Sequence, residues 1–218
     1  MNCVVTAGPT YEPLDKVRRL TNFSTGRLGA ELANWLTAHG HAVTLLLGEQ
    51  ATFRSEIHAQ KVEIFGTTSD LEEQLHRQGA RAIDAVFHAA AVSDFKFGQL
   101  WLRSKEGELT DVNAGKIPTG QGTVLAELVP TSKIIAHLRD WFPRARLVGW
   151  KFEVEGERAR VIELAQAQIS GCRTDACVAN GPAYGTGFGL VRPGIEPLHL
   201  PDKSRLFAAL TSLLDNRL

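Results

Sequence analysis

The residues with the clearest chemical potential lie between Thr6 and Ala33. There an apolar strand over residues 3–6 runs to Gly8, and a glycine-bearing helix follows only after an extended polar insertion. An ordinary dinucleotide-binding unit passes from its first strand through a tight G-x-G-x-x-G turn straight into the helix. Here that turn is missing, so the insertion is free to carry reactive side chains.

The helix is expected to begin near Thr25, because apolar residues at 28, 32, 35 and 36 fall on one helical face. Ser24 or Thr25 is a natural cap. A helix start offers unpaired backbone N–H groups and about half a positive charge. Gly26 and Gly29 would let a phosphate approach, and Arg27 would add a full charge. The segment therefore predicts a polyphosphate cradle, although by itself it also fits a capped helix after a surface loop.

Composition restricts the class of protein. Lys plus Arg and Asp plus Glu number 24 each, so the basic excess typical of nucleic-acid binding is missing. The three cysteines show no common zinc spacing. Cys3 and Cys177 sit in apolar, strand-like runs and are expected to be buried thiols. No apolar run approaches the roughly 20 residues needed to cross a bilayer, and no signal core opens the chain. We therefore expect a soluble, reduced, cytoplasmic protein.

Strand and helix patterns alternate along the rest of the chain. Ser69 followed by Glu72 suggests a capping box for one of the helices. Strands are expected at 42–47, 62–65, 85–91, 147–150 and 176–179, with helices from about 69, 132, 158 and 204, and short β-like runs at 189–191 and 197–200. This order predicts an α/β fold, a Rossmann-like, doubly wound, mostly parallel sheet with a small C-terminal β appendage. At 218 residues, one domain over 1–218 is expected.

Residues 93–129 do not follow this alternation of strand and helix patterns. They contain five glycines, few apolar pairs and scattered lysines. We expect this stretch to form a mobile flap.

The insertion and its flanks resemble a known family. The segment is similar to T-A-G-x-T-x-E-P-[IL]-D-x-V-R-x-[IL]-x-N-x-S-[ST]-G, the opening of the phosphopantothenoylcysteine synthetases, which form an amide in coenzyme A biosynthesis. The matching residues are Thr6, Gly8, Thr10, Glu12, Pro13, Asp15, Val17, Arg18, Asn22, Ser24 and Gly26. The resemblance continues at later strand ends and covers nearly the whole chain.

Three of these later matches imply roles for particular residues. The run 89–95 is similar to A-A-V-A-D-[YF], which makes Asp94 a nucleotide-base residue, and 148–153 is similar to V-G-F-x-x-E, which places Trp150 beside the nucleotide. Lys116 matches the first lysine of the family's K-x-K-K flap motif, whose other two lysines are missing here. Gly181 stands where the family has an aspartate. Taken alone, Asp94 could be a solvated loop residue and Trp150 a core residue.

The resemblance implies a two-step mechanism. The carboxylate of 4'-phosphopantothenate attacks the α-phosphate of a nucleoside triphosphate and releases pyrophosphate, and the amine of cysteine then displaces the nucleotide monophosphate. By this resemblance, Asn22 would contact the acyl carbonyl region and Lys116 the activated phosphate, while Arg18 would contact the phosphopantothenate of its own or of a partner subunit. Without the motif, Asn22 reads equally as a loop cap and Arg18 as a surface charge.

The resemblance also implies the ligands and partners. CTP is expected over ATP, with Mg²⁺ held largely by phosphates and water. The expected nucleotide contacts are Gly8, Ser24, Thr25, Gly26, Arg27, Ala89, Ala90, Asp94 and Trp150. The flavin-dependent decarboxylase of many family proteins occupies a separate N-terminal domain, so no flavin is expected. Family members are dimers, and a homodimer is expected, with no nucleic-acid or membrane partner.

Two other classes remain as alternatives. The run 88–91 resembles the strand exit of NAD(P)-dependent short-chain or epimerase-like oxidoreductases, and Glu49 lies where a ribose-binding acid should be. Their Y-x-x-x-K pair is missing, because the residues four beyond Tyr11 and Tyr184 are Asp15 and Phe188. No G-x-x-x-x-G-K-[ST] occurs, which excludes a P-loop. The third class is a non-catalytic or altered-substrate relative of the synthetases.

Overall fold

A computed structural model describes residues 1–112, 115–117 and 122–215 of the chain. Its main feature is an eight-stranded sheet in the order β13-β12-β11-β10-β6-β1-β4-β5. The strands of this sheet are β1 (Asn2–Ala7), β4 (Ala42–Gly48), β5 (Lys61–Phe65), β6 (Ala85–His88), β10 (Arg146–Phe152), β11 (Ala176–Asn180), β12 (Phe188–Arg192) and β13 (Ile195–Leu200). The first six are parallel, and β12 and β13 add an antiparallel edge.

Among the described residues, five helices cover the two faces of the sheet. They are α1 (Arg27–Ala38), α2 (Thr68–Gly79), α3 (Ile134–Trp141), α4 (Arg158–Cys172) and α5 (Lys203–Asp215). Alternate residues of β1 divide between two cores: Val5 packs in the core that holds α1 and α5, while Val4 packs in the core that holds α2 and α3. This alternation is the period of a strand buried on both faces. The predicted doubly wound α/β fold with a C-terminal β appendage is confirmed.

The capping prediction for α2 is wrong by two residues. The capping box consists of Thr67 and Asp70, and not of Ser69 and Glu72. The Thr67 side chain accepts the Asp70 N–H, while the Asp70 carboxylate accepts the Thr67 N–H at 2.8 Å. Aspartate can close the box as glutamate does, so the strict S/T-x-x-E pattern selected the wrong register.

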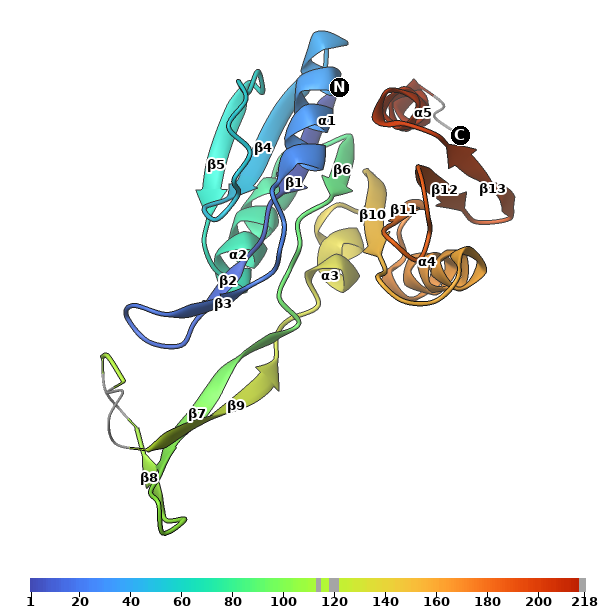
Figure 1. Ribbon diagram of the computed structural model, residues 1–218. Helices are drawn as coiled ribbons and strands as arrows, with labels where there is room; N and C mark the ends of the chain where they lie inside the picture. The colour runs from blue at the N-terminus through green and yellow to red at the C-terminus, as the bar shows by residue number, and fades with distance from the viewer. Residues whose placement is uncertain (113–114, 118–121, 216–218) are drawn as a thin grey trace.

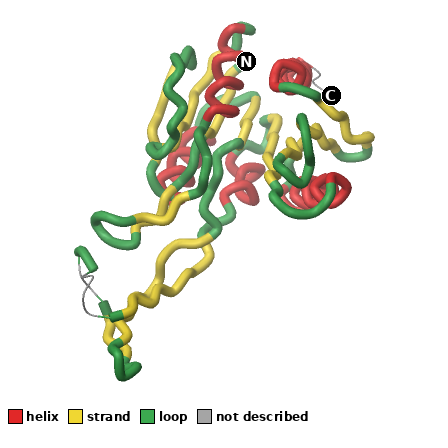
Figure 2. Tube along the Cα trace, viewed as in Figure 1, coloured by secondary structure: helices red, strands yellow, loops and turns green. Residues whose placement is uncertain are grey.

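In the part of the chain that the structure describes, two small antiparallel sheets lie outside the main sheet. The polar insertion forms a hairpin of β2 (Tyr11–Pro13) and β3 (Arg19–Thr21). The expected flap contains an arm of three strands, β7 (Phe95–Arg103), β8 (Leu109–Asp111) and β9 (Thr123–Pro130), in the order β8-β7-β9. Figure 1 shows this arm extending away from the helices, and Figure 2 shows it as strand and loop without helix.

The three cysteines are free and buried. Burial raises the pKa of Cys3 and of Cys177 to about 12, which keeps both thiols protonated and poorly nucleophilic. The prediction that these two residues are buried thiols is confirmed. In the described part of the chain, none of the helices has the length and apolar character to cross a membrane.

Candidate functional site

Two glycines shape the backbone where β1 ends and α1 begins. Gly8 and Gly26 have φ values of 84° and 75°, a left-handed conformation that favours glycine. A Cβ added to either would lie 2.9 Å from the Cβ of Ala51. The two turns and the loop after β4 are therefore packed backbone against backbone.

The start of α1 differs from the prediction. Gly26 is the N-cap residue and no side chain caps the helix, so the expectation that Ser24 or Thr25 caps it is wrong. The left-handed turn at Gly26 delays helical geometry until Arg27. The hydroxyl of Thr25 instead accepts the Arg27 N–H from outside the helix, at 3.3 Å.

This helix start is suited to an anion. The first hydrogen bond across the turn runs from the Ala30 N–H to the Gly26 carbonyl at 3.0 Å. The N–H groups of Leu28 and Gly29 therefore have no acceptor within the helix. The first turn of α1 carries no acidic residue that would occupy them. The geometry supports the predicted phosphate cradle.

Asn22 lies beside the end of β6. Its Nδ2 donates to the carbonyl oxygens of Ala91 and Val92 at 3.2 and 3.1 Å. Both amide hydrogens are thus directed at backbone carbonyls, which leaves Oδ1 as the polar atom that this side chain can offer to a ligand.

A buried polar network supports the same strand end. The Thr6 hydroxyl accepts the Ala90 N–H at 3.1 Å and lies 3.0 Å from Nδ1 of His88. Burial lowers the pKa of His88 to about 4, so its imidazole is neutral near pH 7. A neutral ring can accept the Thr6 proton at Nδ1, which fixes the backbone of residues 88–90 at the sheet edge.

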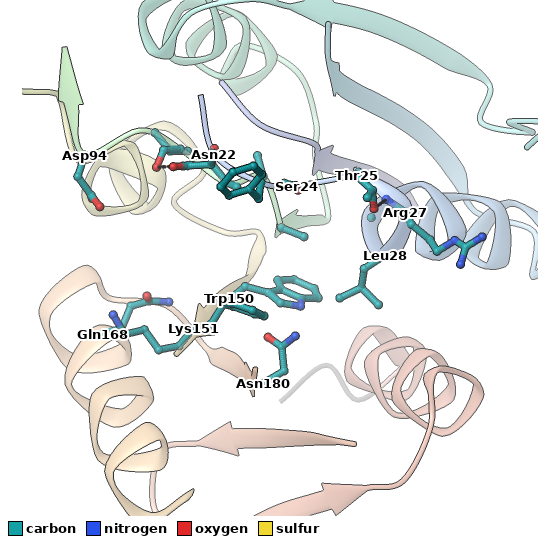
Figure 3. Close-up of a pocket in the computed structure, with 18 residues that line it drawn as sticks. Asn22, Ser24, Thr25, Arg27, Leu28, Asp94, Trp150, Lys151, Gln168 and Asn180 are labelled. Atoms are coloured by element: carbon teal, nitrogen blue, oxygen red, sulfur yellow. Dashed lines mark hydrogen bonds between the residues drawn. The ribbon is translucent and has the colours of Figure 1, made fainter. Parts of the chain in front are cut away.

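A cleft of about 660 Å³ opens at the carboxyl ends of the parallel strands. Nine of the predicted site residues line it: Asn22, Ser24, Thr25, Gly26, Arg27, Ala89, Ala90, Asp94 and Trp150. Figure 3 shows Asn22, Ser24 and Thr25 on one side and Trp150, Lys151 and Asn180 on the other. A second hollow of about 680 Å³ shares Asp94, Trp150 and Lys151 with it and extends past His88 to α3 and α4. Gly8 is not in the lining, and it acts through the packing described above.

Sequence reasoning assigned no role to three polar residues of the cleft, Lys151, Gln168 and Asn180. Lys151 follows Trp150 at the end of β10, and its ammonium lies 2.9 Å from the Glu153 carboxylate. Its place at a strand exit could have identified it, whereas Gln168 lies within a helix and had no such signal.

Two polar atoms in the cleft wall lack a partner. Among the described residues, Nε1 of Trp150 and Oδ1 of Asn180 are buried without a hydrogen bond. One is a donor and the other an acceptor, so a bound ligand or an ordered water can satisfy them.

Arg18 and Lys116 do not line the cleft, and their predicted roles stay predictions. Arg18 donates to the Asp15 carboxylate at 2.6 Å and to the Ile117 carbonyl at 2.8 Å. The Gly115 carbonyl accepts the Lys16 N–H at 3.0 Å. Lys116 is therefore held, exposed, against the turn of the β2–β3 hairpin.

Asp15 is the centre of this contact, which we call the Asp15 latch (Asp15, Lys16 and Arg18 with residues 115–117). Its side chain is 1 % exposed and accepts hydrogen bonds from the N–H groups of Val17, Arg18 and Ile117. Burial by itself would raise the pKa of this carboxyl. The Arg18 guanidinium and the three N–H donors outweigh burial and hold the pKa well below its usual range.

The site offers little that could hold a metal by itself. Within the described ranges, no group of three or more His, Cys, Asp or Glu residues is placed to bind an ion. Asp94 is the one carboxylate among the lining residues of the cleft. This donor set fits Mg²⁺ that is held mainly by the phosphates of a nucleotide and by water.

Comparison with known proteins assigns the chain to a protein family. Residues 1–195 match the family model described as the DNA/pantothenate metabolism flavoprotein C-terminal domain. A curated relative, the coenzyme A biosynthesis bifunctional protein CoaBC of Thermococcus kodakarensis, is 34 % identical over 177 residues. These residues make up 81 % of this chain but only 40 % of the relative, so the chain spans less than half of that protein's length.

Solved structures share the fold. The crystal structure of the DNA/pantothenate metabolism flavoprotein from Streptococcus pneumoniae superposes with a TM-score of 0.85 at 23 % identity, over 99 % of this chain and 98 % of that one. A Cab2 mutant in complex with phosphopantothenate-cysteine superposes with a TM-score of 0.74 at 18 % identity, over 98 % and 86 % of the two chains.

Proposed function

This chain belongs to the DNA/pantothenate metabolism flavoprotein C-terminal domain family, and from that premise we propose that it is a ligase that joins 4'-phosphopantothenate to cysteine. The observation that carries the proposal is the cleft, in which nine residues expected from the synthetase resemblance meet at one sheet edge. The name of the Thermococcus kodakarensis relative and the product bound to the Cab2 mutant agree with this activity.

In the first step, a carboxylate oxygen of phosphopantothenate attacks the α-phosphorus of the nucleotide. The bond from that phosphorus to the bridging oxygen breaks, and pyrophosphate leaves. The open N–H groups of α1, with Arg27 beside them, would bind the negative phosphate oxygens. Mg²⁺, when bound to the phosphates, would neutralise part of their charge.

In the second step, the cysteine amine attacks the acyl carbonyl, the nucleotide monophosphate leaves, and one proton is released. Asn22 is the residue we propose at this carbonyl. Because its Nδ2 already donates to Ala91 and Val92, its Oδ1 is the atom suited to accept a hydrogen from the cysteine amine. Donation to the acyl oxygen would require one of those two bonds to be exchanged.

We further infer that CTP is the preferred nucleotide. Asp94 lies at the end of the cleft opposite Arg27, and a carboxylate can accept a hydrogen bond from the exocyclic amine of cytosine. Adenine also carries such an amine, so the preference rests mainly on the family resemblance of residues 89–95. Lys116 and Arg18 are proposed as phosphate ligands that the Asp15 latch holds together.

The chain is proposed to act as a cytoplasmic homodimer. The three buried, free thiols are in keeping with a reducing compartment. Exposed apolar side chains on the β2–β3 hairpin and the arm provide a surface that a second copy could cover.

The test is pyrophosphate release from CTP, ATP, GTP and UTP with phosphopantothenate, followed by addition of cysteine. We expect pyrophosphate with CTP first, and the amide product once cysteine is present. Failure to release pyrophosphate from any nucleotide would move the protein to the non-catalytic or altered-substrate class. Oxidation of NAD(P)H by a carbonyl substrate would instead identify an oxidoreductase.

A further inference from the structure

A smaller hollow adjoins the cleft at the start of α1. It has a volume of about 470 Å³ and shares Thr25 and Arg27 with the cleft. Its full lining is Thr25, Arg27, Thr52, Phe53, Arg54 and Ser55. This lining contains two guanidinium groups and three hydroxyls but no carboxylate. We call it the Arg27–Arg54 hollow.

The loop that carries Arg54 is fixed relative to α1. It follows β4, which ends at the same sheet edge as β1. The Phe53 N–H donates to the Thr25 carbonyl at 3.0 Å, and Ala51 packs against Gly8 and Gly26. The hollow is therefore built onto the proposed phosphate cradle, and its position does not depend on side chains alone.

The charge of Arg54 is not neutralised within its own contacts. Its Nη1 donates to the carbonyl oxygens of Ala51 and Phe53, at 2.8 and 3.2 Å, and neither acceptor carries a formal charge. These two bonds hold the guanidinium in place, while its other N–H donors can meet a ligand in the hollow.

The charge of Arg27 is only partly neutralised. Its Nε lies 3.5 Å from Glu31, but Glu31 also accepts a hydrogen bond from Lys203. The guanidinium lies over the Phe53 ring, 5.9 Å from its centroid. One carboxylate is thus shared between two cations, and the hollow carries a net positive charge.

We propose that the Arg27–Arg54 hollow binds the pyrophosphate portion of the nucleotide, its β- and γ-phosphates, with Arg54 as a binding residue. The inference rests on the proposed function, in which pyrophosphate is the first leaving group. A nucleotide with its base near Asp94 and its α-phosphate at Gly26 would direct its remaining phosphates toward Thr25 and Arg27, the residues shared by both cavities. Two guanidinium forks suit such a multiply charged anion better than one.

The experiment compares the parent with Arg54→Ala, Arg54→Lys and a matched control, Arg144→Ala. Arg144 is exposed and borders a cavity at the opposite end of the sheet. Calorimetric titration with CTP, CMP and inorganic pyrophosphate, each with Mg²⁺, measures affinity without requiring turnover. A thermal melt of each variant establishes that it is folded.

We expect Arg54→Ala to weaken binding of CTP and pyrophosphate by about ten-fold, as for loss of a charged hydrogen bond, and to leave CMP affinity within about two-fold. Arg54→Lys should restore part of the loss, and the control should match the parent. Unchanged pyrophosphate affinity in Arg54→Ala, or equal losses for CTP and CMP, would overturn the inference. Arg54-dependent binding by a parent that forms no amide would refute the proposed function and leave the pyrophosphate subsite standing.

Discussion

At the scale of single residues, the shape of the cleft depends on side chains that form hydrogen bonds with the surrounding backbone. Asn22 is an example, because it joins the segment before α1 to the end of β6 through two carbonyls. Any role in catalysis is therefore coupled to its role in holding residues 91 and 92. A substitution that changes the amide without changing its size separates these contributions best.

We predict that Asn22→Asp lowers kcat for amide formation by about 100-fold, the scale seen when one transition-state contact is lost. The carboxylate would face two carbonyl oxygens and has no hydrogen to donate to them. The KM for CTP should change by less than about three-fold, since the phosphate cradle is formed by α1. Steady-state kinetics with cysteine as the varied substrate measure the effect.

The control for this prediction is Asn34→Asp. Asn34 also uses its amide to bond backbone, with Glu56 and His58 as partners, but it lies outside the cleft. It should keep kcat near that of the parent. Equal rates in Asn22→Asp and the parent would remove Asn22 from the mechanism.

Residue His88 predicts how stability depends on pH. Its pKa is lowered by burial to about 4, from 6.5, so the unfolded chain binds a proton at a higher pH than the folded one. The stability contributed by neutral His88 is complete above pH 6.5 and is lost as pH falls toward 4. Lowering the pH from 7.5 to 5 should therefore decrease the free energy of unfolding by about 2 kcal/mol through His88.

The measurement is urea unfolding of the parent and His88→Phe at both pH values. Between pH 7.5 and pH 5, the free energy of unfolding of His88→Phe should fall by about 2 kcal/mol less than that of the parent. The carboxylates that titrate in this interval are common to both proteins and do not contribute to the difference. Parallel losses in the parent and His88→Phe would show that His88 is not the titrating group.

At the scale of elements, burial determines what the sequence reveals. The parallel strands are continuous apolar runs because helices cover both of their faces, so β1, β4 and β6 could be predicted from composition alone. The strands of the arm are mostly exposed, and the hairpin strands are only three residues long. Neither gives the alternation of buried and exposed residues that marks a strand.

The residues of the site also divide into those that the sequence predicts and those that it does not. Residues at the ends of predicted strands, such as Asp94 and Trp150, could be placed in one cleft because parallel strands share an edge. The Arg27–Arg54 hollow could not, because the loop after β4 has no pattern that predicts a contact with Thr25. The N-cap at Gly26 was missed because a left-handed turn removes Ser24 and Thr25 from the capping position.

The Asp15 latch makes a prediction about the arm. Replacing Asp15 with Asn removes the charge that Arg18 and three N–H groups bind. Residues 115–117 should then leave the hairpin more often, which exposes the Lys116–Ile117 bond. We expect tryptic cleavage there to accelerate about ten-fold, since cleavage follows the population of the open form.

Mass spectrometry of the fragment beginning at Ile117 measures this cleavage. Asp111→Asn is the control, because Asp111 lies on β8 in the same arm and is exposed. It should be cut at the parent rate. A similar rate in Asp15→Asn and the parent would show that the latch does not restrain the segment.

At the scale of the whole molecule, six of the exposed large apolar side chains of the described residues lie on elements outside the main sheet, and the others lie on or next to β5, β10 and β13. The six are Val17, Leu20, Phe23, Phe95, Leu109 and Leu128, each at least 38 % exposed. The arm that carries three of them extends beyond the helices (Figure 2), and its described strands are mostly exposed. Soluble monomers seldom leave such surface uncovered.

We therefore predict that sedimentation velocity will give a mass about twice the 23.8 kDa of one chain. Leu128 is 49 % exposed and lies opposite Phe97 in the arm. Leu128→Glu would place a charge in the proposed interface, where it would be buried without a partner. The dimer dissociation constant should rise by at least about ten-fold, a change set by the cost of desolvating the carboxylate.

The control is Val154→Glu, at an exposed apolar position that precedes α4, which should leave the dimer intact. A parent that sediments as one chain at all concentrations would contradict the proposal, and Arg18 would then have to reach the cleft of its own chain.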